Sequence, residues 1–420
     1  MALNYVWIVF FVIGLFIALI RLIFFHDYEI FKKLVEGIFD SSKSSVMDIG
    51  LPLAGAMVFF MGLMNIGEKA GAVNFLARIL NPFMKRLFPE VPEKHPAMGQ
   101  MVMNFSANML GLDNAATPFG LKAMESLQTL NPQKETASNA QIMFLVLHTS
   151  GLTLIPLSII AYRASGGSTN PTSVFVPLML ATTVATVASI IITGIYQRLR
   201  FDRVLVFWLG GIITSICLFA WFISGLPSQK TVPEPSLFTK ETFSNVLGNM
   251  ILFLIISAFI IGGFIRKINV FDAFIEGAKQ GWEVVIKVIP YLVGLLVAIR
   301  VFRDSGALDA IISGISWCFV QLGITSDFVP ALPVAIMRPF SGGGSRGLML
   351  DIFKNYGADS FVGQLASTLQ GSADTTFYII ALYFGSVGIK KVRYAIWAGM
   401  LADVIGVIAA ILIAYIFYSH

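Results

Sequence analysis

Nine long apolar runs separated by short polar segments constrain the fold of this chain more than any other feature. Charged residues make up only 13% of the 420 residues, whereas a soluble domain carries about 25%. Most of the runs approach the length of about 20 residues that a helix needs to cross the hydrocarbon layer of a membrane. The sequence therefore predicts an all-α polytopic membrane protein. The runs cover residues 5–20, 46–64, 142–161, 175–195, 204–222, 246–264, 284–301, 377–387 and 394–417.

The basic residues gather at the ends of these runs. A net charge of +5 would by itself suit a nucleic-acid partner. Instead, the basic segments 196–203, 265–267 and 390–393 lie between apolar runs, as in loops that face the cytoplasm. We therefore expect the protein to contact membrane lipid and no nucleic acid.

The C-terminal third of the chain resembles the earlier part. Residues 180–196 align with 401–417 at an offset of 401 − 180 = 221, and residues 147–154 align with 369–376 at an offset of 369 − 147 = 222. The second match pairs Ser150 with Ser372 and Thr153 with Thr375. Two weaker matches occur in the same order along the chain: residues 104–111 with 339–346, and residues 34–42 with 274–282.

These matches divide the chain into two halves, 1–200 and 266–420, joined by two connecting helices in 201–265. A basic cluster follows the run 175–195, whereas a basic cluster precedes its partner 394–417. Opposite ends of matched helices would then face the cytoplasm, which is the inverted repeat common among transporters. Arg21, Lys32 and Lys33 oppose this orientation, because they follow the first helix, whose end the scheme places outside.

Each half contains a segment too polar for an ordinary spanning helix. The first is 101–124, and the second is 337–353 together with 365–380. Non-helical backbone at membrane depth is tolerated only where protein buries it or where it lines a wet cavity. The sequence therefore predicts hairpin tips or broken helices that approach one another and bind a solute. The residues expected to bind it are Asn104, Ser106, Asn108, Asn114, Thr117, Ser150, Arg338, Ser341, Gly342, Gly343, Gly344, Ser345, Arg346, Gln370, Ser372, Asp374 and Thr375.

Glycines 342, 344 and 347 match the GxGxxG pattern of dinucleotide-binding loops. That pattern carries meaning only between a strand and a helix of a βαβ unit. Pro330, Pro333 and Pro339 argue against a preceding central strand. The sequence therefore predicts no dinucleotide and no other cofactor or metal, and it does not specify a coupling ion.

Arg338, Arg346 and Asp374 are the most informative charges, because ionisable residues within a membrane are expensive and usually functional. Two interpretations stay open. The side chains bind solute, or an Arg–Asp ion pair fixes the loop; both can hold together. For the amides and hydroxyls, the alternative to solute binding is hydrogen bonding between helices. His148 could relay protons, but without a visible carboxylate partner it fits a packed polar residue better.

The polar segments also resemble known families. The segment NFSANMLGLDNAATPFGLKAM (104–124) resembles the spore maturation protein A family, and RPFSGGGSRG (338–347) with LQGSADTTFYIIALYFGSVGIKKVRYA (369–395) resembles the spore maturation protein B family. Both belong to the nucleoside recognition or Gate group, which is similar to the permeation domains of concentrative nucleoside transporters. The resemblance implies two Gate-type repeats with re-entrant helices in a bacterial cytoplasmic (inner) membrane.

These observations favour a transporter or permease for a small polar or anionic solute, bound between the two polar hairpins. The alternative is a non-transporting scaffold for envelope or spore-cortex maturation, in which the polar groups would satisfy one another without a cavity. A homodimer stays open as an assembly. The sequence contains no HExxH, GxSxG or Walker motif, so we expect no enzymatic activity.

Overall fold

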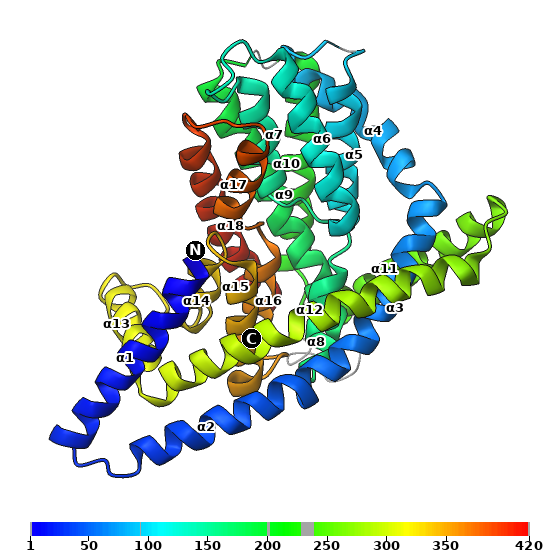
Figure 1. Cartoon of the computed structure of the whole chain (residues 1–420). Coiled ribbons are helices and arrows are strands. Elements are labelled where there is room, and N and C mark those ends of the chain that lie inside the picture. Colours follow the sequence, from blue (N-terminus) through cyan, green and yellow to red (C-terminus); the bar gives the residue numbers. More distant parts are fainter. Residues whose placement is uncertain (1, 93, 200–201, 228–238, 419–420) are drawn as a thin grey trace.

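The computed structural model describes residues 2–92, 94–199, 202–227 and 239–418. Within these ranges the chain forms helices and loops, and its strand-like pairing is limited to one isolated bridge between Thr136 and Lys391. Helices that are long and apolar enough to cross a membrane confirm the predicted all-α polytopic fold (Figure 1). The described part contains seven such stretches: Trp7–Phe24, Ile30–Lys69, Pro171–Tyr196, Leu205–Ser224, Val246–Ile265, Val270–Asp304 and Ala395–Tyr418.

The two halves contain the same elements in the same order: a long helix, a helical hairpin, a broken helix and a final spanning helix. In the first half these are α3 (Leu51–Lys69), α5 (Pro96–Met109) with α6 (Asp113–Leu130), α7 (Asn139–Thr149) with α8 (Leu157–Ser165), and α9 (Phe175–Tyr196). In the second half they are α12 (Val270–Asp304), α14 (Leu332–Met337) with α15 (Gly342–Tyr356), α16 (Phe361–Gly371) with α17 (Thr376–Ser386), and α18 (Ala395–Tyr418).

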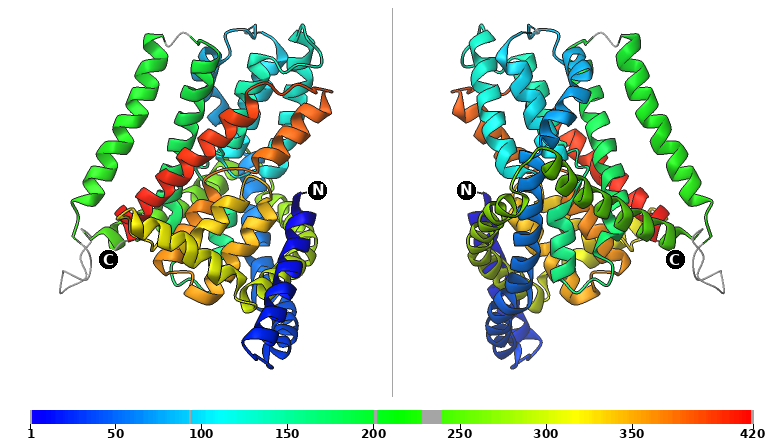
Figure 2. Two further views of the ribbon diagram at one scale, coloured as in Figure 1. Left: turned by 90° about the vertical axis from the view of Figure 1, so that its left-hand side faces the viewer. Right: turned by 90° about the vertical axis from the view of Figure 1, so that its right-hand side faces the viewer.

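The other elements surround or connect these repeats. Helix α10 runs along the outside of the bundle (Figure 2). These elements are α1 (Ala2–Phe24), α2 (Ile30–Ser44), a π-helical turn η1 (Ser45–Gly50), α4 (Ala72–Leu87), η2 (Pro171–Val174), α10 (Arg203–Ser224), α11 (Lys240–Ile265), α13 (Ala307–Gln321) and η4 (Val329–Ala331).

The two hairpins enter the bundle from opposite ends (Figure 1). At one end, the loop after α6 contacts the loop before α18, where the backbone amide of Lys390 donates to the carbonyl of Glu135 at 2.9 Å. At the other end, the loop after α15 contacts the loop before α9, where the amide of Thr169 donates to Asp359 at 2.7 Å, and Arg163 of α8 pairs with the same carboxylate at 2.8 Å. In each half, the loop after the hairpin therefore contacts the loop before the final helix of the other half. Such reciprocal contacts at opposite ends are what an inverted repeat requires.

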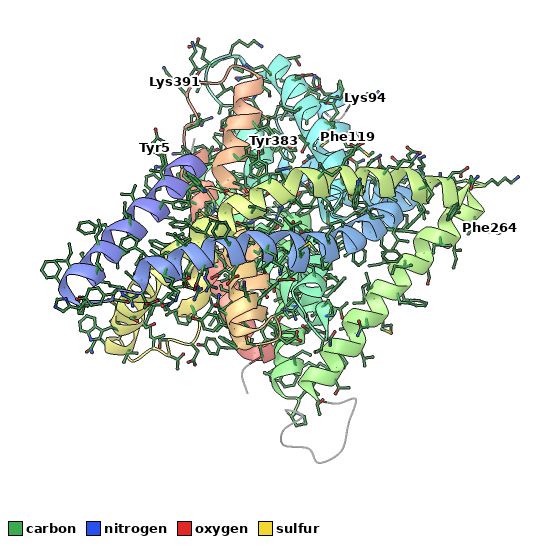
Figure 3. The ribbon with its side chains drawn as sticks, turned by 60° about the horizontal axis from the view of Figure 1, so that its bottom comes forward. Tyr5, Lys94, Phe119, Phe264, Tyr383 and Lys391 are labelled. Carbon is green, nitrogen blue, oxygen red and sulfur yellow. The ribbon has the colours of Figure 1, made fainter. Side chains whose placement is uncertain are left out.

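Basic clusters from both halves meet at one end of the molecule. The Gln197 side chain donates to the carbonyl of Asn139, and Arg393 donates to its side-chain oxygen. Lys94 and Lys391 lie at this same end (Figure 3). The junction of α1 and α2, where Arg21 lies, is at the other end (Figures 1 and 2). Arg21 therefore lies at the end opposite the basic clusters, so it opposes in the fold, as in the sequence, the orientation that those clusters favour.

Helices α3 and α12 pack along each other through glycines. A Cβ added at Gly277 would lie 2.4 Å from the carbonyl oxygen of Met61, and one at Gly281 would lie 2.9 Å from that of Met57. Small residues permit such close approach, which supplies packing in lipid where water does not drive helices together. At 35 residues, α12 is roughly 50 Å long, so it can cross a hydrocarbon layer of about 30 Å only at a strong tilt or by extending beyond it.

The structure corrects the expectation that residues 142–161 form one continuous apolar run across the membrane. The helix stops at Thr149 and restarts at Leu157. Gly151 has a φ of +61°, a left-handed conformation that only glycine adopts readily, and Pro156 precedes the new helix. The run 377–387 is likewise only the short helix α17, the second part of the corresponding broken helix.

Large apolar side chains cover the outer helices. Tyr5 on α1 is 65% exposed and Phe264 on α11 is 78% exposed, and both point away from the bundle (Figure 3). Such side chains are stable facing hydrocarbon rather than water. The chain is therefore a multi-pass membrane protein whose polar groups turn inward.

The Arg163–Asp359 contact connects the two halves. The Arg163 side chain is fully buried and also donates to the carbonyl of Ala358 at 2.7 Å. Burial raises the pKa of the Asp359 carboxyl, but hydrogen bonds from Ser168 and Thr169 and the charge of Arg163 outweigh burial and hold that pKa below its usual value. Folding therefore gains stability when Asp359 is ionised.

We predict that Asp359→Asn lowers the free energy of unfolding by roughly 1 kcal/mol near neutral pH, a value reduced for partial exposure of the carboxylate. Because the folded pKa is lowered, this stabilisation is present above the pKa of unfolded Asp and is lost as the pH falls through the folded pKa. Melting temperatures measured against pH should converge in acid. Asp309→Asn, which removes a carboxylate that is 63% exposed, should have no such effect. A constant gap between Asp359→Asn and wild type at every pH would contradict the prediction.

Candidate functional site

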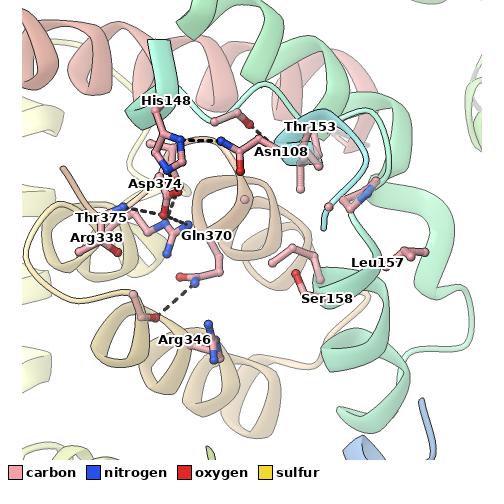
Figure 4. Close-up of a pocket in the computed structure, with 18 of the residues that line it drawn as sticks. Asn108, His148, Thr153, Leu157, Ser158, Arg338, Arg346, Gln370, Asp374 and Thr375 are labelled. Carbon is pink, nitrogen blue, oxygen red and sulfur yellow. Dashed lines mark hydrogen bonds and ion pairs between the residues drawn. The ribbon is translucent and has the colours of Figure 1, made fainter. Parts of the chain in front are cut away.

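A cavity of about 280 Å³ lies where the four interruptions of the helices meet. Its wall comes from the tip of the first hairpin, the break between α7 and α8, the tip of the second hairpin and the break between α16 and α17 (Figure 4). The predicted approach of the polar segments 101–124 and 337–353 is confirmed, because both contribute residues to this one cavity.

The interrupted backbone is satisfied by contacts between these segments. The amide of Leu154 donates to the carbonyl of Met109 at 2.7 Å, so the first hairpin tip binds the first break. The amide of Phe377 donates to the carbonyl of Pro339 at 3.1 Å, which is the corresponding contact in the second half. The amide of Asp374 donates to the carbonyl of Thr149 at 2.8 Å and joins the two breaks. Non-helical backbone is stable at this depth because it is bonded in this way.

Asp374 lies between two cationic or potentially cationic groups. Its carboxylate oxygens are 3.8 Å from Arg338 Nη2 and 3.8 Å from His148 Nε2. The Nε of Arg338 donates to the carbonyl of Ala373 at 2.7 Å, which holds the guanidinium beside the break. A Cβ at Gly342 would lie 2.8 Å from Arg338 Nη1 and 2.9 Å from Thr375 Oγ1, so glycine there lets the guanidinium keep this position.

His148 is the centre of a buried polar cluster. Its Nδ1 lies 2.8 Å from Asn108 Nδ2 and 3.0 Å from Asn104 Oδ1, and its ring meets Tyr383 edge-on. The sequence showed no carboxylate partner for His148, and the structure corrects this, because Asp374 supplies one from the other half. Asn104 lies behind the cavity wall, whereas Asn108 and His148 line it.

Arg346 points into the cavity from the first two turns of α15 (Figure 4). Its guanidinium lies 5.1 Å from the centre of the Tyr162 ring, and within the described part of the chain no carboxylate pairs with it. The sequence left open which arginine would pair with Asp374, and in the structure Arg338 is the arginine beside it.

The triple glycine begins a helix instead of forming a loose tip. Ser341 caps α15, and its hydroxyl accepts the amide of Gly344 at 2.9 Å. The amide of Gly344, a residue expected to bind solute, is therefore bonded within the protein. Of the three glycines, Gly342 lines the cavity. Ser345 lies behind the wall and donates to Gln370 Oε1 at 2.5 Å, which orients that amide.

Three predicted hydroxyls, at Ser106, Ser150 and Ser372, instead donate to carbonyls of their own helices. Ser150 and Ser372, which the sequence paired, both occupy the residue after a broken helix ends. The Asn114 side chain lies outside the part of the chain that the structure describes. The predicted residues that line the cavity are Asn108, Thr117, Arg338, Gly342, Arg346, Gln370, Asp374 and Thr375, whereas Asn104, Ser106, Ser150, Ser341, Gly343, Gly344, Ser345 and Ser372 are not among its lining residues.

Sequence reasoning missed the contribution of the first broken helix. Thr153, Ser158 and Tyr162 line the cavity from the segment that follows Gly151. The Ser-Gly and Ile-Pro pairs within 150–156 were the available signal, because such pairs mark interruptions of helices. Arg346 and Tyr162 come from different halves, so their contact had no signal in the sequence.

The model of the nucleoside recognition (Gate) family matches residues 51–194 and 285–390. Spore maturation protein B of Bacillus subtilis (strain 168) is 46% identical over 166 residues, covering 40% of this chain and 92% of that protein. Spore maturation protein A of the same organism is 38% identical over 197 residues, covering 47% of this chain and 96% of that protein. No solved structure matches the chain. Each relative thus corresponds to less than half of this chain.

We predict that Gly120→Ala disrupts the polar cluster around His148. A Cβ at Gly120 would lie 2.0 Å from the Tyr383 hydroxyl oxygen and 2.9 Å from Asn104 Nδ2, so overpacking should cost about 1 to 3 kcal/mol of stability. Gly99→Ala is the control, because its Cβ meets nothing within 4 Å and alanine favours a helix by up to about 1 kcal/mol. Equal melting temperatures for the two variants would refute the prediction.

Proposed function

This chain belongs to the nucleoside recognition (Gate) family, and we propose that it is a permease for a small anionic solute that binds between the two hairpin tips. The observation that carries the proposal is the charge of the cavity. Among the described residues that line it, Arg338 and Arg346 oppose a single carboxylate, Asp374. An arginine without a carboxylate partner at membrane depth is costly to retain unless it serves a function.

The geometry of the cavity supports binding of an oxyanion. Arg346 presents a planar set of donors that suits carboxylate, sulfate or phosphate. Its Tyr162 neighbour offers an aromatic face that holds the guanidinium without neutralising it. Gln370 and Thr375 line the same cavity and supply neutral hydrogen-bonding groups. Helices α8, α15 and α17 begin at the cavity, and their amino ends favour negative charge.

The arrangement of the halves supports transport. Inverted repeats with a site at the interface of broken helices are a common transporter construction, in which one part moves against another around the site. We propose residues 1–200 and 266–420 as the two halves, with 201–265 as connecting helices. The basic end of the bundle faces the cytoplasm in this proposal, and the membrane is the bacterial inner membrane. No catalytic activity is proposed.

A non-transporting scaffold explains the cavity less well. In a scaffold the polar side chains would all have partners within the protein, as Ser106 and Ser372 have in backbone carbonyls of their own helices. Arg346 instead faces open volume with an aromatic ring as its contact. A partner role in spore maturation, which the names of the two relatives suggest for those proteins, remains compatible with transport.

We predict saturable uptake of sulfate or inorganic phosphate into proteoliposomes that contain the wild-type protein. Arg346→Gln should reduce uptake about tenfold or more, because a hydrogen bond to a charged group contributes about 1.5 to 3 kcal/mol. Arg346→Lys should retain part of the activity. Arg78→Gln, which changes an exposed arginine on α4 outside the cavity, should transport at the wild-type rate.

Melting temperatures of the same variants separate binding from structure. Lost uptake with an unchanged melting temperature supports contact between Arg346 and solute. A lowered melting temperature in Arg346→Gln assigns that arginine to packing against Tyr162. Uptake of the neutral nucleoside uridine with no uptake of either anion would refute the proposed charge selectivity.

A further inference from the structure

A buried carboxylate close to the cavity has no role in the site described above. Asp403 is the only Asp, Glu, Lys, Arg or His in α18, and its residue is 5% exposed. One face of helix α18 packs against α9, α16 and α17, and its other face is exposed on the outside of the bundle (Figure 2). A carboxylate in such a helix is expensive to keep, so its retention calls for a function.

Asp403 is held by a neutral hydrogen bond and by no cation. The hydroxyl of Thr376 donates to Asp403 Oδ2 at 2.6 Å. Throughout the described ranges, no Lys, Arg or His nitrogen lies within the 4.0 Å of an ion pair with this carboxylate. Arg338 and Asp374 are the charges that act on it, and they act in opposite directions.

The helices packed against α18 offer little further charge. Helices α9 and α16 contain no ionisable Asp, Glu, Lys, Arg or His. Helix α7 contributes His148, α17 contributes Tyr378 and Tyr383, and α10, which also packs against α18, contributes Arg203 at its first residue. An ionised carboxylate here has, among the described residues, no cation in ion-pair contact to offset its desolvation, and the neutral carboxylic acid costs less to bury. Binding of a proton is therefore the least costly way to keep Asp403.

The other half of the molecule carries a neutral group at the corresponding place. The offset of 221 between 180–196 and 401–417 pairs Thr182 with Asp403. In the first break, the backbone amide of Thr153 donates a hydrogen bond to Thr182 Oγ1 at 3.4 Å. At the end of the second break, the hydroxyl of Thr376 donates to Asp403 in the same way. A hydroxyl is therefore sufficient to hold such a break, so the carboxylate is present for something besides structure.

We propose that Asp403 is a proton-binding site that couples proton movement to solute movement. This inference rests on the proposed permease function. Thr376 directly follows Asp374 and Thr375, both of which line the cavity. When solute binds to the arginines, the charge around Asp374 changes, and the change reaches Asp403 through this short segment. The carboxylate takes one proton from water on one side, forming an O–H bond, and the same bond breaks when the proton passes to water on the other side.

Infrared difference spectroscopy at two pH values tests proton binding without any solute. Wild type should show the carbonyl band of a protonated carboxylic acid in apolar surroundings, and Asp403→Asn should lack it. Glu135→Gln is the matched control, because Glu135 is exposed and paired with Lys390, and it should keep the band. A band that persists in Asp403→Asn would overturn the proposal.

Sulfate uptake into proteoliposomes tests coupling, because sulfate keeps its charge across the neutral pH range. A pH gradient that is acidic outside should drive sulfate accumulation by wild type, and Asp403→Asn should lose this response while it retains sulfate exchange. Asp403→Thr, which places the residue of the other half at this position, guards against a variant that fails to fold. Accumulation in both variants equal to that of wild type would overturn the proposal. If wild type takes up no sulfate, the permease function is refuted for this anion, and the infrared band alone still decides proton binding.

Discussion

Every feature of this protein depends on one constraint: backbone groups that leave a helix inside an apolar layer must find partners within the protein. Two hairpin tips and two helix breaks meet around one cavity, and each of them is bonded to another. Leu154 donates to Met109, Phe377 to Pro339, and Asp374 to Thr149. The third of these bonds joins the two halves. The cavity is therefore a consequence of how two repeats satisfy each other's broken backbone.

The same arrangement determines the electrostatics. Because the breaks meet, side chains from opposite halves come within a few ångströms. Asp374 reaches His148, and Arg346 reaches Tyr162. Asp374 can partly compensate Arg338, which leaves Arg346 as the cation available to an anion. Asp403 lies one helix further out and contacts the same break through Thr376, so a single segment connects the solute site with a buried carboxylate.

Symmetry in the fold does not produce symmetry in the chemistry. Ser150 and Ser372 occupy equivalent places and bond in the same way. Thr182 and Asp403 also occupy equivalent places, yet one is neutral and the other is a carboxylate. The arginines of the cavity come only from the second hairpin. The first half supplies Asn108, His148 and Tyr162 among others, so the two halves contribute different groups to one cavity.

The sequence by itself determined the membrane class, the repeated order of elements and the two polar hairpins, because apolar run length, internal similarity and misplaced polar residues are local properties. It also identified eight residues that line the cavity, Arg338 and Arg346 among them. Only the tertiary structure decided which charges pair. The partners Asp374 and His148 lie 226 residues apart (374 − 148 = 226), and nothing in a linear pattern specifies which side of a break faces the other half. The break at Gly151 was overlooked although Ser150-Gly151 and Ile155-Pro156 marked it, because the apolar run 142–161 is long enough for a continuous spanning helix.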